Sequence, residues 1–174
     1  LAAKSAQAAG ALGVASDYYE KALTIDPSSL PLQREAMFTF LADGRFDRGV
    51  ELAAKLRDDD DAGKVARIAL GMEALRTGDF DAAIDNLNLP DSSELDTLLL
   101  GQLSAWADAG KGDAGAAIER LDEISGPPWF AIFNLYQKGL IFMQAGQPDE
   151  ARRVLKVLLD DRASVQTSPD AYLA

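Results

Sequence analysis

The chain has 174 residues, of which 48% are hydrophobic and 26% are charged, and its formal net charge is −11. This length allows one domain with a substantial core, and the composition excludes an intrinsically disordered chain. The acidic balance argues against nucleic acid and anionic membrane surfaces as partners, because both require a basic footprint. No apolar run approaches the roughly 18 residues of a transmembrane helix, so membrane insertion is not expected.

The first predicted elements fall in residues 7–27, QAAGALGVASDYYEKALTIDP. A first helix is expected to break at Gly10, because glycine adopts the left-handed conformation that ends many helices. In the second helix Ala15 allows close approach and Tyr19 packs against a neighbour. Pro27 then closes the unit, since proline cannot continue a helix.

Glycine recurs at intervals of 34 residues without an insertion, and neighbouring positions keep the same interval. The register glycines, as they are called below, are Gly10, Gly44, Gly78, Gly112 and Gly146. Five residues after each of them stands a small residue, namely Ala15, Gly49, Ala83, Ala117 and Ala151. An interval of this length is typical of a protein built from repeated helical hairpins. We therefore expect a turn at each register glycine.

The segment GDFDAAIDNL, which begins at the third register glycine, has the clearest helical pattern. Phe80, Ala83, Ile84 and Leu87 are spaced as i, i+3, i+4 and i+7 and so form one apolar helix face. The stretch QPDEA, directly after the last register glycine, places a proline and two acids in a first turn, which indicates a helix start. The whole pattern predicts about ten helices and no strand.

Three stretches depart from the regular pattern. Pro90 falls inside the second helix of the third unit, so that helix is expected to end near Leu89. Ser92 or Ser93 then caps the following helix early, and that helix should be longer than its counterparts. The stretch SGPPW at residues 125–129 predicts a rigid turn.

The joint pattern resembles the tetratricopeptide repeat family, whose unit is a helix-turn-helix of 34 residues. The pieces that carry the resemblance are Leu70-Gly71, Ala15 with Tyr19, Ala22 and Pro27, Ala83 with Leu87, and Gly139 followed by Phe142. The resemblance covers essentially the whole chain. It implies an all-α, right-handed α-solenoid of antiparallel helix-turn-helix units that forms a single domain over residues 1–174. A first helix that Leu1 enters partway, and a truncated sixth repeat from about residue 166, indicate a fragment of a longer chain.

The small positions give a packing hypothesis. The residue seven before each register glycine should face the residue five after it, and in most repeats both are alanine or glycine. In the second repeat these positions hold Met37 and Gly49. We therefore expect Met37 to fill the space that Gly49 leaves open.

The resemblance also implies a concave groove that holds peptides and is lined by the first helix of each repeat. The candidate partner-binding residues on these helices are Arg34, Phe38, Leu41, Ile68, Met72, Leu75, Gln102, Trp106, Phe133, Tyr136, Leu140 and Met143. Family members that grip chaperone tails use lysine and asparagine at such positions, whereas this set has one basic residue and no asparagine. The mostly apolar set favours an apolar strand or an amphipathic helix as ligand.

The expected function is therefore that of a non-catalytic scaffold that binds a peptide or helix of a partner protein. Two alternatives stay open. The chain could be a structural spacer or a self-association module of a larger repeat protein, which allows a homo-oligomer, or the same side chains could pack against neighbouring repeats.

Catalytic and metal-binding patterns are absent from the sequence. Without histidine and cysteine, Ser-His-Asp and Cys-His catalysis and HExxH or zinc-thiolate sites are impossible. AGKGD at 109–113 lacks the Ser or Thr of a phosphate loop, and DDDDAGK at 58–64 has Ala62 at a calcium-ligand position and is followed by Ala69 in place of the glutamate. We therefore expect a protein without catalytic activity, cofactor or bound metal ion. The two stretches are expected to be turns that cap helices.

The start without methionine and the Ala/Asp-rich composition favour an exported bacterial protein, with a cytoplasmic protein as the alternative.

Overall fold

Ten α-helices make up the part of the chain that the structure describes. The structure, a computed structural model, describes residues 1–89 and 93–166, and the surroundings of side chains up to residue 159. Within these ranges no strand occurs, so the expected all-α fold with about ten helices is confirmed. The helices fall into two units, Leu1–Asn86 and Leu87–Ala174. The single domain over 1–174 stays a prediction.

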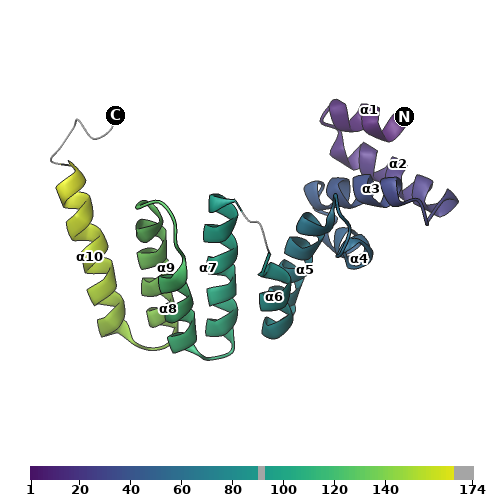
Figure 1. The fold of residues 1–174 in the computed structure, drawn as a ribbon. Helices are drawn as coiled ribbons and strands as arrows, with labels where there is room; N and C mark the ends of the chain where they lie inside the picture. The colour runs from purple at the N-terminus through teal and green to yellow at the C-terminus, as the bar shows by residue number, and fades with distance from the viewer. Residues whose placement is uncertain (90–92, 167–174) are drawn as a thin grey trace. The chain divides into compact units, whose positions relative to one another are not determined.

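In each unit the helices pack on their neighbours in the chain (Figure 1). Unit 1 contains α1 (Ala2–Ala8), α2 (Leu12–Ile25), α3 (Leu30–Ala42), α4 (Phe46–Leu56), α5 (Gly63–Thr77) and nearly all of α6 (Phe80–Leu87). Unit 2 contains α7 (Glu94–Gly110), α8 (Ala114–Glu123), α9 (Phe130–Gln144) and α10 (Pro148–Gln166). The first helices α7 and α9 of two successive hairpins also contact each other directly. Contacts between adjacent hairpins are the building principle of a solenoid.

Every register glycine lies in the turn between the two helices of one hairpin, with a φ between 72° and 86°. The residue after each glycine donates its backbone N–H to the carbonyl oxygen five residues earlier, at 2.9 to 3.1 Å. The five pairs are Ala11 to Ala6, Arg45 to Phe40, Asp79 to Ala74, Asp113 to Asp108, and Gln147 to Phe142. This bond defines the Schellman turn, which satisfies carbonyl groups at a helix end. The predicted turns are confirmed.

The irregular junction between the third and fourth hairpins also follows the expectation. α6 has only 8 residues and ends two residues before the expected end near Leu89. α7 has 17 residues, against 13 in α3 and 15 in α5 and α9. Ser93 caps it: its hydroxyl oxygen accepts the Asp96 N–H, and the Asp96 carboxylate accepts the Ser93 N–H. Pro90, Ser92 and the expected sixth repeat lie outside the described residues.

Each unit has its own apolar core. The core of unit 1 includes Ala15 and Tyr19, both predicted to pack, together with Met37, Phe40 and Leu56. The core of unit 2 is built on Ala105, Ala117, Leu121 and Ile141. Alanine at the register positions lets neighbouring helices approach closely, and the larger residues fill the spaces between them.

The packing hypothesis for Met37 names the wrong partner. A Cβ added at Gly49 would lie 2.5 Å from Cδ2 and 2.7 Å from Cγ of Leu41, so Leu41 is the side chain that occupies this space. In the fifth hairpin the nearest atoms to a Cβ at Gly139 belong to Leu155. At these two glycines the nearest side chain is therefore a leucine of the paired helix.

Candidate functional site

The twelve predicted partner-binding residues lie on the first helices of four successive hairpins. Those on α3 and α5 belong to unit 1, and we call their exposed surface the unit-1 face. Those on α7 and α9 belong to unit 2, and their exposed surface is the unit-2 face. Phe38, Met72 and Leu140 occupy the same repeat position and are exposed to a similar extent, 38%, 40% and 36%.

In unit 1 the predicted residues divide into exposed and packed side chains. Phe38 and Met72 are exposed, whereas Ile68 and Leu75 are partly buried. Leu41 is partly buried as well, because its side chain fills the space over the glycine of α4. The apolar surface that a ligand could contact in this unit is therefore built mainly on Phe38 and Met72.

Arg34 is held by two carboxylates and so does not extend freely from the unit-1 face. Its guanidinium hydrogen-bonds Asp59 Oδ2 at 2.7 Å and also pairs with Asp61. The other oxygen of Asp59 accepts the backbone N–H groups of Asp61 and Ala62. The bond from Arg34, with smaller contributions from these N–H groups, lowers the pKa of Asp59 against the opposing effect of burial. The acidic stretch thus forms a turn that ties the second hairpin to the start of the third.

In unit 2 hydrogen bonds join the two helices that carry the face. Gln102 Nε2 donates to Asn134 Oδ1 at 3.0 Å, and Asn134 Nδ2 donates to the carbonyl oxygen of Leu121 at 3.2 Å. Gln102 is buried, so its predicted place on an open surface is wrong. Trp106 is partly buried: it packs against the unit-2 core and donates its indole N–H to Gln137 Oε1 at 2.9 Å. These bonds fix α9 against α7.

The exposed part of the unit-2 face lies mainly on α9. Phe133, Tyr136, Leu140 and Met143 are all exposed. Trp129, which sequence reasoning assigned only to a rigid turn, continues the same row, and its ring meets that of Phe133 edge to face at 5.6 Å. The spacing of four, three, four and three residues from Trp129 to Met143 was the signal that could have revealed it. We call these five residues the α9 stripe.

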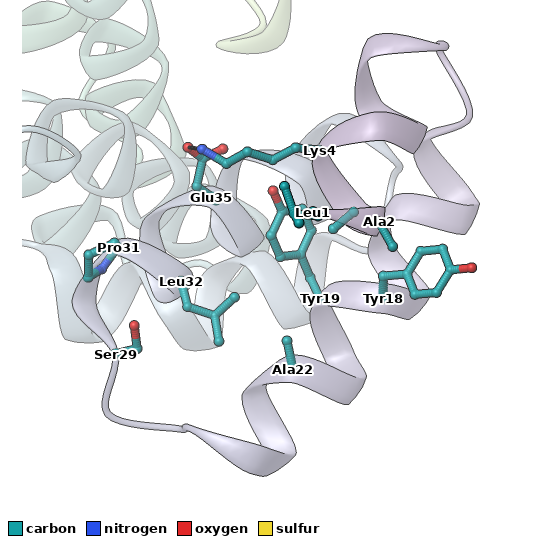
Figure 2. A pocket seen from close by; sticks show the side chains of 11 residues that line it. Leu1, Ala2, Lys4, Tyr18, Tyr19, Ala22, Ser29, Pro31, Leu32 and Glu35 are labelled. Carbon is teal, nitrogen blue, oxygen red and sulfur yellow. Dashed lines mark hydrogen bonds and ion pairs between the residues drawn. The ribbon is translucent and has the colours of Figure 1, made fainter.

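A pocket of about 450 Å³ lies between α1, α2 and α3. Figure 2 shows Leu32 and Ala22 on one side of it, and the Lys4 side chain extending toward Glu35. Lys4 Nζ lies 2.8 Å from Glu35 Oε1. Tyr19 borders the pocket and donates its hydroxyl hydrogen to Gln7 Oε1 at 3.1 Å. Mostly apolar walls suit a hydrophobic side chain, but sequence reasoning did not foresee a pocket here.

Acidic side chains in the described ranges serve as helix caps and ion-pair partners. Asp79 accepts the N–H of Ala82, and Asp113, in the stretch compared with a phosphate loop, accepts the N–H of Ala116. Within residues 1–89 and 93–166 no group of three or more acidic side chains could hold a metal ion. No helix in the same ranges is long and apolar enough to cross a membrane.

No protein-family profile and no curated protein sequence matches the chain. Solved structures match over almost its whole length. Two crystal structures of MamA, each 21% identical to the chain, give TM-scores of 0.71, covering 97% of this chain and 92% of that one, and 0.68, covering 95% and 97%. TPR-like repeats of a protein assigned as a kinesin light chain in Podosopora anserina give 0.67 at 18% identity, covering 95% and 93%.

The hairpins, their common turn and these similarities define an all-helical repeat protein of the α-solenoid class. More particularly, the chain has the tetratricopeptide repeat fold.

Proposed function

We propose that the chain is a non-catalytic, protein-binding repeat module that holds an apolar strand or amphipathic helix of a partner against its first-helix faces. The observation that carries this proposal is the recurrence of Phe38, Met72 and Leu140 at one repeat position with similar exposure. Exposed apolar side chains that gather on one face often mark interaction sites in soluble proteins. Methionine and aromatic side chains also adapt readily to different apolar ligands.

A non-catalytic role is supported by the chemistry of the chain. It contains no histidine or cysteine, and Asp59, Asp79 and Asp113 are engaged in structural hydrogen bonds. The fold alone does not assign a function, since one fold supports many activities. The proposal therefore rests on the apolar faces.

Met72→Glu tests the proposal on the unit-1 face. Proteins retained by the immobilised wild-type chain are identified by mass spectrometry, and a peptide from the retained protein is titrated against the purified variants by calorimetry. We expect Met72→Glu to weaken binding at least about tenfold, because it places a charge in an apolar contact. Val14→Glu is the matched control, since Val14 is an exposed apolar residue on helix α2, 50% exposed against 40% for Met72. Equal binding by both variants would contradict the proposal.

A further inference from the structure

A second pocket, of about 460 Å³, lies in unit 2 where α8 is joined to α9. Its walls come from the end of α8, from residues 124–128 of the connecting turn and from the first part of α9. Both hairpins that meet at this junction, α7–α8 and α9–α10, are described by the structure. None of the twelve predicted partner-binding residues lines the pocket, and no residue of the α9 stripe does. The pocket is therefore separate from the first-helix faces.

In unit 1 a glutamine ties the corresponding turn to its helix. Gln33 on α3 donates a side-chain N–H to the carbonyl oxygen of Pro27 at 2.6 Å. The residue three repeats further along the chain is Leu135 on α9, which has no polar group for such a bond. The turn before α9 therefore lacks this tie, and Leu135 instead forms part of the pocket wall.

The turn between α8 and α9 is held in place from within. A Cβ added at Gly126 would lie 2.2 Å from Cε2 of Phe130, so a side chain at this position would displace the Phe130 ring. Pro127 and Pro128 restrict the backbone φ, and the carbonyl oxygen of Pro127 accepts the N–H of Phe130 at 2.9 Å. A pocket whose walls are already ordered loses less conformational entropy when a ligand binds.

Lys138 brings a charge into this largely apolar pocket. It stands eight residues before the last register glycine, and the residues at this position of the other hairpins are uncharged, namely Ala2, Ala36, Leu70 and Ser104. The side chain of Lys138 is only 13% exposed. Its ammonium group donates a hydrogen bond to Asp122 Oδ1, whose side chain is 64% exposed. A mostly buried cation is thus paired with a carboxylate that lies mostly in water.

The ammonium group of Lys138 has more donors than the protein uses. It carries three N–H groups, and Asp122 is the one acceptor that the described residues provide. A carboxylate accepts strong, charge-assisted hydrogen bonds from such donors. A hydrocarbon group attached to that carboxylate would gain by contact with apolar walls such as Leu121 and Leu135.

The pocket volume is at the lower end of the range of small-molecule sites, which is about 300–1,000 Å³. We propose that this pocket binds a small organic acid, with its carboxylate on Lys138 and its hydrocarbon part against the apolar walls. In the structure Asp122 occupies the place of the ligand carboxylate. Because the Asp122 side chain is mostly exposed, it can turn into water when the acid binds. Asp122 is therefore a competitor that weakens binding of the acid.

An NMR titration with hexanoate tests the proposal, with hexanol as a probe that lacks the carboxylate. Amide signals of residues 121–138 should shift when hexanoate is added to the wild-type chain, with a dissociation constant in the millimolar range or below. Hexanol should bind at least about fivefold more weakly, because it cannot replace the Asp122 carboxylate as a charged acceptor.

Lys138→Met should raise the dissociation constant for hexanoate at least about tenfold and change that for hexanol by less than about twofold. Methionine suits this position, since Leu70 holds it in another hairpin, and thermal denaturation verifies the fold. Asp122→Asn should lower the dissociation constant for hexanoate at least about threefold, because the competing charge is removed. Lys156→Met on α10 is the matched control: it removes an exposed lysine outside the pocket and should leave hexanoate binding unchanged.

Equal affinity for hexanoate and hexanol would overturn the proposal, as would hexanoate shifts that do not cluster at residues 121–138. Unchanged hexanoate affinity in Lys138→Met, or weaker binding in Asp122→Asn, would also contradict it. Each of these results is independent of the test of the proposed function, since Met72→Glu alters the unit-1 face.

Discussion

The indole N–H of Trp106 on α7 is bonded to the side-chain carbonyl of Gln137 on α9, so one hydrogen bond joins two helices of the unit-2 face. We expect Gln137→Ala to lower the free energy of unfolding by about 1 to 2 kcal/mol, because the partly buried indole loses its acceptor. Urea denaturation measures the loss, and the chemical shift of the indole proton reports the broken bond. Gln144→Ala, an exposed residue on the same helix, is the control and should change neither quantity. An unchanged indole shift in Gln137→Ala would contradict the assigned bond.

The buried amide pair of Gln102 and Asn134 should show strong coupling. Asn134→Ala is expected to cost about 1 to 3 kcal/mol, because it leaves the Gln102 amide and the Leu121 carbonyl without their partner. The double variant Gln102→Leu/Asn134→Leu should be more stable than Asn134→Ala, since it removes both polar groups. A double-mutant cycle by urea denaturation measures the coupling. Additive effects of the two single leucine substitutions would argue against a direct bond.

The Arg34–Asp59 pair makes stability depend on pH in the acidic range. The pKa of Asp59 is lowered in the folded chain, mainly by the bond from Arg34, so the unfolded chain takes up a proton first as pH falls. The stabilisation is therefore complete above the unfolded pKa of about 3.9 and is lost as pH falls through the lower folded pKa. Asp59→Asn should reduce the urea midpoint at pH 7 and approach the wild type in acid.

Asp60→Asn in the same turn is the control for this prediction, because Asp60 is exposed. It should leave the difference in urea midpoint between neutral and acidic pH close to that of the wild type. A constant offset between Asp59→Asn and the wild type at every pH would rule out this titration.

Two glycines of unit 1 should respond to alanine with opposite signs. Gly44 has a φ of 79°, so Gly44→Ala is expected to destabilise the fold by about 1 to 2 kcal/mol. Gly13 lies inside α2, where an added Cβ would meet only Asp43 Oδ1 at 3.6 Å, an ordinary contact. Gly13→Ala should therefore stabilise the fold by about 0.5 to 1 kcal/mol through helix propensity. Thermal denaturation measures the melting temperature of both variants. A change of the same sign in both, relative to the wild type, would contradict this prediction.

Local signals made most of the fold predictable. The turns at the register glycines and the cap at Ser93 depend on a few consecutive residues, and each was placed correctly. The contact of Leu41 with Gly49 was not predicted, because it depends on the rotation of one helix against the other and on a leucine rotamer. Repeat spacing predicts which positions face a neighbouring helix. It does not predict which side chain of that helix they contact.

The candidate site was predictable as a set of helix positions and less so as a surface. The positions on α9 are exposed as a row, yet Gln102 at an equivalent position is buried, because Asn134 provides it with a partner. Arg34 is likewise held by an acidic turn 25 residues further along the chain. Hydrogen bonds and ion pairs between hairpins determine which of these positions remain exposed to a ligand. The spacing of the repeats does not predict these pairs.

Packing between neighbours in the chain has a kinetic consequence. The helix pairs that pack most extensively are neighbours in the chain. The segments that must be closed to form these contacts are therefore short, and the entropy lost in the folding transition state is small. Folding can begin at any hairpin and spread to the adjacent one. A substitution in one hairpin, such as Gly44→Ala, should therefore leave the first steps of folding in α7 to α10 unchanged.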